Sequence, residues 1–449
     1  MHCPDHAGVG HCPGMARHAV LILVVALFRA AAFAAPPPEG FGGHPESLRI
    51  RLVTIGPGAD MHQRFGHSAL WVEDTRLKKG LLYSYGTTSI ANGGPVRFLL
   101  GRPTFWAARL SVERTFLLYR ALARSIDVQD LMLTVEQRQR LLARLERDVQ
   151  PASREYAYHP LKDNCATRVR DVLDEALGGA LREALTEPAR ATQRELLRRY
   201  IQTHPVSELL LMLWLNDAVD APATQWEEAF LPRELARLLM GVSYVDGSGR
   251  RIPLVNREGA SSPSMDASAP VDAGWEGTSA WGLGAGGAAL AIILAFLRGR
   301  GTHRMFQILF GLYHAVFGLT LGAAGVALGG LMLFSRLDVM QGNENLLLAN
   351  PLAFGLLPLG ILMMSGSERA ERWARRCVWL LAAGSLLAVV LKLLPSFDQD
   401  NRRPMALWLV ANLGLGLAHA WRLRRPSTAP APAAGAREGA RGSTRWWAV

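Results

Sequence analysis

Two side chains that lie far apart in the sequence have the types needed for a nucleophile and its base. Cys165 stands in the segment DNCATRVRDVLDEALGG, and His67 stands in FGHSALWV. A cysteine thiolate attacks carbonyl carbons, and an imidazole can remove the proton of the thiol near neutral pH. If the fold brings the two side chains together, this pair predicts acyl chemistry through a covalent thioester.

Cys165 is predicted to begin an amphipathic helix. Asp163 or Asn164 is a suitable N-cap, and Gly178 with Gly179 is a suitable C-terminal stop. The sulfur would lead the apolar face and point at whatever that face packs against; the face consists of Val169, Val172, Leu173, Ala176 and Leu177.

The start of a helix favours the reactive form of a cysteine. Unpaired backbone N–H groups and the positive end of the helix dipole stabilise a thiolate. The alternative interpretation is a small, buried and inert residue that fills the first helical turn, since free cysteines are commonly buried. The choice between the two depends on whether a base lies nearby.

His67 is the preferred base. His67, Ala69 and Trp71 share one face of a predicted strand, and the small Ala69 leaves room beside the imidazole. His62 and His159 are the alternatives. The preceding Gly66, and the lack of another external cysteine for a base to serve, favour His67.

The other cysteines argue against a metal or disulfide framework. After residue 12 there is no close-spaced cysteine pair and no Cys/His cluster of the zinc type, so we predict no metal and no cofactor. Residues 1–35 are predicted to be a signal peptide with a possible true start at Met15; an uncleaved anchor from Ala19 to Phe33 is the alternative. Cys377 lies in a later apolar run. Cys165 would then be a lone thiol outside the cytoplasm.

The composition predicts a membrane protein. Among 449 residues, 49% are hydrophobic and the mean hydropathy is +0.11, which is high for a wholly soluble chain. The net charge of +11 comes from scattered arginines rather than from one basic stripe. We therefore expect no nucleic-acid partner, and the charge is compatible with anionic lipid.

Residues 36–255 are predicted to form a mixed α/β domain. A capping box from Thr134 to Gln137 should open a helix that continues to Val149. Further helices are expected at 194–201 and 207–215. The expected strands are 48–56, 67–72, 80–86 and 125–133.

The second half of the chain is predicted to cross the membrane five times. Residues 256–280 are rich in Ser, Gly, Ala and Pro and are expected to be a flexible linker, and residues 422–449 a disordered cytoplasmic tail. The apolar runs between them each have the length needed to cross a bilayer core. They are 281–298, 305–334, 345–364, 377–394 and 405–421.

Charge in the short loops predicts the orientation. The first and third loops and the tail carry the excess of arginine, which favours the cytoplasmic side. The α/β domain is then external, in agreement with the predicted signal peptide. The arginines are Arg298, Arg300, Arg304, Arg369, Arg372, Arg375, Arg376, Arg422, Arg424 and Arg425.

Several motifs together resemble a known family. FGHSAL, YSYG, DNCATRVRD and WEEAFLP are similar to the periplasmic domain of the Lnb family of bacterial lipoprotein N-acyltransferases. The five-span region with NENLLLANPL also resembles the membrane domain of that family. The resemblance covers residues 49 to 421.

The resemblance implies an α+β protein whose periplasmic catalytic domain has a circularly permuted papain-like (NlpC/P60-like) fold, followed by an all-α five-helix transmembrane domain. His67 and Cys165 occupy the matching catalytic positions, with the histidine strand preceding the cysteine helix. Ser84 or Tyr85 is expected to orient the imidazole. Backbone N–H groups near Cys165 are expected to hold the oxyanion, helped by Asn164 or Tyr158.

The implied activity is the transfer of an acyl chain from a phospholipid to the N-terminal, lipid-modified cysteine of a diacylated lipoprotein at the bacterial inner membrane. A cell-wall peptidase of the NlpC/P60 type and a non-catalytic membrane sensor or scaffold are the alternatives. Polar residues near the external ends of the spans would either line a path for lipid or cap helices; they are Asn343, Asn345, Asn350, Gln399 and Asn401. Contacts with lipid headgroups are expected from a set of aromatic and basic residues; the alternative is that they are ordinary surface residues. They are Trp106, Arg109, Arg114, Arg120 and Trp281.

Overall fold

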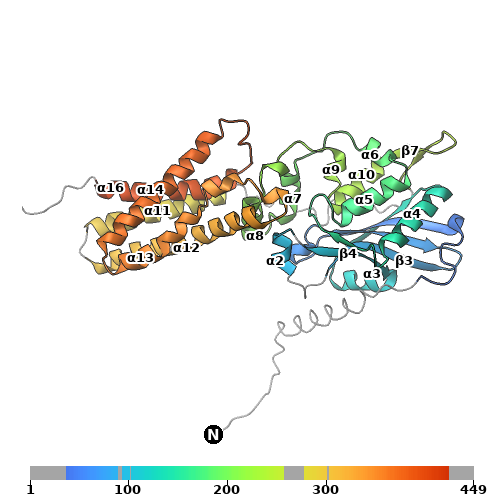
Figure 1. Cartoon of the computed structure of the whole chain (residues 1–449), viewed down its shortest axis with the longest axis horizontal. Coiled ribbons are helices and arrows are strands. Elements are labelled where there is room, and N and C mark those ends of the chain that lie inside the picture. The colour runs from blue at the N-terminus through green and yellow to red at the C-terminus, as the bar shows by residue number, and fades with distance from the viewer. Residues whose placement is uncertain (1–36, 89–93, 102, 257–277, 301–302, 424–449) are drawn as a thin grey trace, which may run out of the picture.

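The computed structural model describes residues 37–88, 94–101, 103–256, 278–300 and 303–423. A sheet domain (37–256) and a helical domain (278–423) lie end to end (Figure 1). The predicted signal peptide 1–35 lies outside the described residues. So do nearly all of the predicted linker 256–280 and of the predicted tail 422–449.

The main sheet of the sheet domain is antiparallel, with six strands in the order β5-β1-β2-β3-β4-β6, and β7 and β8 form a separate two-stranded sheet. The four expected strands are confirmed as β1, β2, β3 and β5, whereas β4 and β6 were not predicted. The bounds are β1 Leu48–Ile55, β2 His67–Asp74, β3 Lys79–Thr87, β4 Thr104–Ser111, β5 Ile126–Leu131 and β6 Glu155–Ala157.

The two faces of the sheet are covered differently. Alternation along β1 and β2 sends Leu52 and Leu70 to a face that packs on α4 (Val135–Asp148), α5 (Cys165–Ala176) and α10 (Pro232–Gly241). Val53 and Ala69 point to the other face, which α3 (Val112–Ala121) covers. We call these the α5 face and the α3 face.

The predicted helix boundaries are confirmed by their caps. Thr134 and Gln137 form the capping box of α4. Of the two candidate N-caps of α5, Asn164 is the one used, and Gly178 and Gly179 end the helix with φ of +68° and +94°. The smaller elements are α2 Gly94–Leu99, α6 Ala180–Ala184, α7 Gln193–Ile201, α8 Pro205–Trp214, α9 Gln225–Glu228, β7 Ser243–Val245 and β8 Arg251–Pro253.

Three of the five expected spans are single helices long and apolar enough to cross a membrane. They are α11 (Thr278–Arg300), α12 (Arg304–Phe334) and α14 (Glu368–Leu391). The expected span 345–364 is instead broken into 338–347 and 351–364, bent by 57°, and α13 (Leu356–Met364) forms its second half. The break lies at Pro351, which begins a new turn capped by Asn350. Proline cannot continue the preceding helical segment, because it has no backbone N–H to donate. With this bent pair as one span the count among the described residues is four.

The expected fifth span, 405–421, is also irregular. It consists of α15 (Arg402–Pro404), a π-helical turn η8 (Met405–Leu409) and α16 (Val410–Leu423). Five spans therefore remain a prediction. The arginines at the end of α11 and the start of α14 lie at the end of the bundle away from the sheet domain, as the predicted orientation requires (Figure 1).

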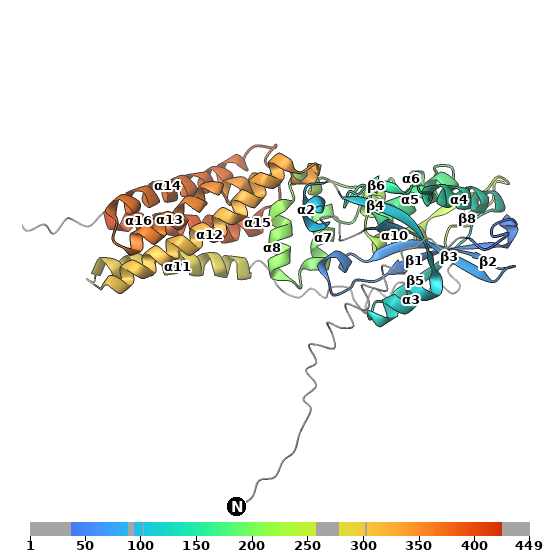
Figure 2. The same cartoon turned by 60° about the horizontal axis from the view of Figure 1, so that its bottom comes forward.

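Helix α8 lies between the two domains (Figures 1 and 2). The carbonyl of Leu213 at its C-terminal end accepts hydrogen bonds from Nδ2 of Asn343 (2.9 Å) and of Asn345 (3.0 Å). The Leu215 carbonyl accepts one from Gln399 Nε2 (2.9 Å). All three amides are buried, so they fasten α8 to the helical domain instead of lining a path for lipid. Asn350 caps the turn at Pro351.

Candidate active site

Cys165 is held at the start of α5 by the residue before it. The side-chain oxygen of Asn164 accepts from the amides of Ala166 (2.8 Å) and Thr167 (3.0 Å). Its Nδ2 donates to the carbonyls of Pro160 and Phe230. Both N–H groups of this amide are therefore engaged, and Asn164 has no spare donor for the oxyanion contact expected of it.

The thiol reaches the end of the sheet where β3 is irregular. The β3–β4 register shifts between Ser84 and Thr87, and Gly86 within this bulge has φ of +89°. A Cβ placed on Gly86 would lie 3.6 Å from the Cβ of Cys165. The backbone N–H of Ser68, the residue after His67, points toward the sulfur. The fold thus brings Cys165 to the end of β2 at which His67 lies.

His67 is the first residue of β2 and pairs with Ile55 of β1. Its Nε2 lies 2.8 Å from Oγ of Ser84 on the α3 face. In the tautomer that carries its proton on Nε2, the imidazole donates to Ser84 and the lone pair of Nδ1 is left as an acceptor. Of the two expected orienting residues, Ser84 is the one in contact. Tyr85 instead donates to Oδ2 of Asp148 at 2.8 Å.

The two alternative bases lie in different surroundings. His62 is exposed. His159 has both ring nitrogens engaged: Nε2 lies 3.0 Å from Oδ1 of Asp338, and Nδ1 accepts from the amides of Leu161 and Lys162. His67 lies at the same end of the sheet as Cys165, on the α3 face, and its role as the base stays a prediction.

Burial shifts the pKa of both members of the pair toward the neutral form. Burial, helped by the positive charge of Arg124, lowers the pKa of His67 to about 4. Burial also raises the pKa of Cys165, although the amides of Ser68, Ala166 and Cys165 itself and the charge of Arg124 act in the opposite direction. The expected preference for a thiolate at the helix start is therefore outweighed by burial. At neutral pH the site holds a thiol and a neutral imidazole.

The sequence analysis missed Arg124. This side chain is 7% exposed, donates from Nε to the carbonyl of Gly56 (2.8 Å), and lies 4.8 Å from the centre of the Tyr119 ring. Gly56 follows Ile55, which pairs with His67, so Arg124 lies at the same end of the sheet as the imidazole. No local pattern marks this residue, because an arginine before a short strand is ordinarily a surface residue.

Two tyrosines shortly before α5, Tyr156 in β6 and Tyr158 just after it, also lie near the thiol. The ring of Tyr158 stacks on the ring of Phe105, with 4.2 Å between the ring centres. The ring centre of Phe98 lies 5.9 Å from that of Tyr158. Burial and the nearby Cys165 raise the pKa of Tyr158 and of Tyr156, so both phenols stay protonated. Tyr158 was expected here, whereas Tyr156 was not.

The residues just before Cys165 contact the helical domain. His159 and Lys162 both pair with Asp338, which follows the end of α12. Leu161 belongs to a buried cluster that also contains Leu331 and Val339 of the helical domain. The thiol end of the sheet domain is therefore the end that faces the membrane-capable helices.

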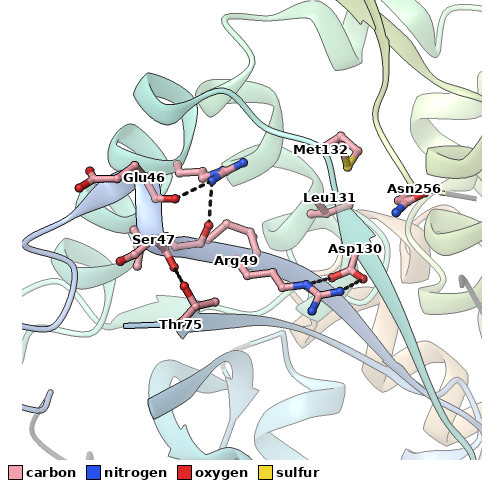
Figure 3. Close-up of a pocket in the computed structure, with 11 residues that line it drawn as sticks. Glu46, Ser47, Arg49, Thr75, Asp130, Leu131, Met132 and Asn256 are labelled. Atoms are coloured by element: carbon pink, nitrogen blue, oxygen red, sulfur yellow. Dashed lines mark hydrogen bonds and ion pairs between the residues drawn. The ribbon is translucent and has the colours of Figure 1, made fainter. Parts of the chain in front are cut away.

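Two hollows lie elsewhere. One of about 280 Å³ is bounded by Arg49, whose guanidinium forms two hydrogen bonds with Asp130 (Figure 3). It opens at the Leu48 end of β1, roughly 20 Å along the strand from the Ile55 end, where His67 lies. The other, of about 450 Å³, lies beside α10 and β7. Neither includes Cys165 or His67. The described residues contain no group of three or more His, Cys, Asp or Glu side chains arranged to hold a metal ion.

The expected headgroup residues differ in exposure. Arg109 is buried and pairs with Glu146, so it does not contact headgroups. Arg114 and Arg120 are exposed on α3, and Trp281 is 54% exposed near the start of α11. Arg168, on the second turn of α5, is half-buried against Asp163.

Comparison with known proteins gives one match. Residues 43–199 match the family model described as the Lnb N-terminal periplasmic domain. The match spans β1 to α7 and contains His67, Ser84, Tyr156 and Cys165. No curated protein and no solved structure matches the chain. The papain-like permutation therefore stays a prediction, whereas the resemblance of this segment to the Lnb domain is confirmed.

Proposed function

Since residues 43–199 are an Lnb N-terminal periplasmic domain joined to membrane-capable helices, we propose that this protein transfers an acyl chain from a phospholipid to the N-terminal, lipid-modified cysteine amine of lipoproteins. One observation carries the proposal. Cys165 and His67 lie at one end of the sheet, and the loop that leads into Cys165 contacts Asp338 of the helical domain.

The first half of the reaction loads the enzyme. Nδ1 of His67 takes the proton of the Cys165 thiol as the sulfur attacks the ester carbonyl of the phospholipid, and the carbonyl becomes a tetrahedral oxyanion. When this intermediate collapses, the ester C–O bond breaks and His67 gives its proton to the leaving alkoxide. The products are a lysophospholipid and an acyl thioester on Cys165.

The second half transfers the chain. The neutral α-amine of the lipoprotein cysteine attacks the thioester carbonyl, a C–N bond forms, and His67 removes the proton of the attacking nitrogen. Collapse breaks the C–S bond, and the proton on His67 returns to the sulfur. The products are an N-acylated lipoprotein and the free thiol, so no oxidant, metal or cofactor enters the balance.

The arrangement of the two domains suits these substrates. Both the phospholipid and the lipoprotein are anchored in a bilayer by their acyl chains. A thiol that lies beside the ends of membrane-spanning helices can meet each of them at the membrane surface, without removing either from lipid. We place this surface at the outer leaflet of the inner membrane, because the arginine-rich turns lie at the far end of the bundle.

The direct test replaces the nucleophile. Purified full-length Cys165→Ala and Cys165→Ser variants, supplied with phospholipid vesicles and a synthetic diacylated lipopeptide, should form no N-acylated product by mass spectrometry, and only the unsubstituted protein should gain an acyl mass on Cys165. Cys377→Ala is the matched control, because this other described free cysteine lies in α14. Full product from Cys165→Ala would end the proposal.

A cell-wall peptidase with the same pair of residues is the competing enzymatic function. It predicts cleavage of purified muropeptides by the protein and loss of that cleavage in Cys165→Ala. The non-catalytic alternative, a sensor or scaffold, predicts that Cys165→Ala behaves like the unsubstituted protein in cells and in vitro.

A further inference from the structure

Tyr156 lies beside the candidate nucleophile and has no part in the reaction as described above. It is the central residue of β6 and pairs with Phe105 of β4. The guanidinium of Arg168 covers its ring at 3.7 Å from the ring centre. Arg168 is itself fixed by two hydrogen bonds to Asp163, of 2.6 and 2.8 Å. The start of the cysteine helix therefore holds this ring in place.

The hydroxyl of Tyr156 is buried and has no acceptor for its hydrogen among the described residues, although the backbone N–H of Gly86 points toward its oxygen. A buried hydroxyl without a partner costs free energy, and nearly all such groups in folded proteins are paired. Other buried tyrosines of this chain follow that rule: Tyr85 donates to Asp148, and Tyr244 donates to the carbonyl of Met132 and to Gln137. The unused donor of Tyr156 is thus an exception located at the active site.

Gly86 lies close to both this hydroxyl and the cysteine. A Cβ built on Gly86 would lie 3.6 Å from the Cβ of Cys165 and 4.0 Å from the phenol oxygen of Tyr156. Both groups therefore lie next to the position that a side chain at residue 86 would occupy.

We propose that Tyr156 donates its phenolic hydrogen to the oxyanion that forms when Cys165 attacks an acyl carbonyl. The inference rests on the proposed acyl transfer and adds a catalytic residue to it. Both halves of that reaction pass through a tetrahedral oxyanion, so the same donor acts twice. The remaining donor is the backbone N–H of Cys165 at the free start of α5.

The surroundings of the phenol suit a neutral donor. Burial raises its pKa, so the hydroxyl keeps its proton at working pH. The positive charge of Arg168 over the ring face favours the negative charge that the phenol shares through a strong hydrogen bond to an oxyanion. Asn164, by contrast, has both donors engaged.

The experiment removes only the hydroxyl. Full-length Tyr156→Phe is compared with the unsubstituted protein in vesicles that contain phosphatidylethanolamine, with a synthetic diacylated lipopeptide as acceptor. We expect the rate of acyl-thioester formation and of N-acylation to fall on the order of 100-fold, as for the loss of one oxyanion donor, with little change in KM.

Two further measurements distinguish a catalytic role of Tyr156 from a structural one. Alkylation of Cys165 by iodoacetamide develops no carbonyl oxyanion, so its rate should stay within about twofold in Tyr156→Phe. The melting temperature should change little, because the hydroxyl donates to no acceptor that the substitution would remove. Tyr244→Phe is the matched control: it loses two hydrogen bonds far from the site, so it should melt earlier and keep its acylation rate.

Three outcomes would overturn the inference. One is an acylation rate in Tyr156→Phe within about threefold of the unsubstituted protein. Another is a large loss in Tyr158→Phe with none in Tyr156→Phe. The third is a parallel loss of alkylation and of thermal stability in Tyr156→Phe, which would mark a structural residue. N-acylation by Cys165→Ala would instead refute the proposed function itself, so the two failures are distinguishable.

Discussion

At the scale of single residues, the chemistry of His67 is set by two side chains that the fold places near its ring. Ser84 contacts Nε2 of its ring, and Arg124 places a positive charge at the same end of the sheet. The first neighbour fixes which ring nitrogen is free to act as a base. The second, together with burial, keeps the imidazole neutral.

Ser84→Ala should slow acyl transfer by about 3- to 10-fold, the value of one neutral hydrogen bond that orients the imidazole. The loss should appear in kcat rather than in KM, because Ser84 contacts His67 and not the substrate. Steady-state kinetics measure this. Ser153→Ala, which removes a serine hydrogen bond to the Arg147 carbonyl, is the control and should keep full activity.

The pH profile of the reaction should fall on the acid side near pH 4. His67 acts as a base only while neutral, and its pKa is about 4, so activity is lost as the pH falls through that value. The contribution of His67 to folding stability also decreases as the pH falls. The unfolded chain binds a proton at this residue near pH 6.5 and the folded chain only near 4, so stability decreases as the pH falls from 6.5 to 4.

Burial is the larger cause of the low pKa of His67, and Arg124→Met tests the second cause, the charge of Arg124. Removal of the charge should raise the pKa of His67 and move the acid limb of kcat/KM to higher pH. The same change should raise the pKa of Cys165 and slow its alkylation at a fixed pH. An acid limb at the same pH as in the unsubstituted protein would show that Arg124 does not act on this pair.

At the scale of secondary structure, the start of α5 combines stability with the position of the nucleophile. Asn164 caps the helix with two accepted hydrogen bonds and also ties it to the loops at Pro160 and Phe230. Thr134 caps α4 through a comparable side-chain hydrogen bond, and this helix start lies far from the thiol.

Asn164→Ala should lower the free energy of unfolding by about 1–2 kcal/mol and should also reduce activity, since it releases the turn that carries Cys165. Thr134→Ala is expected to cost about 1 kcal/mol without reducing the activity of the folded fraction. Urea unfolding and acylation assays on both variants check this. Equal activity in the two variants would contradict the positioning argument.

At the scale of the whole molecule, the sheet domain is fixed to the membrane-capable helices through ion pairs and buried amides. Glu208 of α8 is fully buried and pairs with Arg198 and with Arg403 of the helical domain. His159 and Lys162 pair with Asp338 close to the thiol. These contacts fix the position of Cys165 relative to the helical domain.

Asp338→Asn should weaken the contact nearest to Cys165. We expect acyl transfer from phospholipid vesicles to fall several-fold, whereas hydrolysis of a soluble ester should change little, because only the former needs the domains aligned with a bilayer. Asp398→Asn replaces an exposed aspartate of the same domain and is the control. A parallel loss toward both substrates would indicate damage to the site itself.

Local signals in the sequence determined much of this protein. The helix that begins at Cys165, its glycine stop, the capping box at Thr134 and four of the strands depend on residues that are neighbours in the chain, as do the three long apolar helices. The same is true of His67 and Ser84, since YSYG forms the strand that pairs with FGHSALWV. Local patterns of this kind are set by short-range hydrogen bonding and by the burial of one face.

Only the tertiary structure decided the rest. The burial that keeps Cys165 and His67 neutral arises from packing between segments about a hundred residues apart, so the helix start by itself gave the wrong protonation state. Tyr156 and Arg124 became visible only once strand register and the bulge at Gly86 placed them beside the thiol. The partners of Asn343 and Asn345 in the broken span were likewise hidden, because a polar residue near a helix end reveals its partner only in three dimensions.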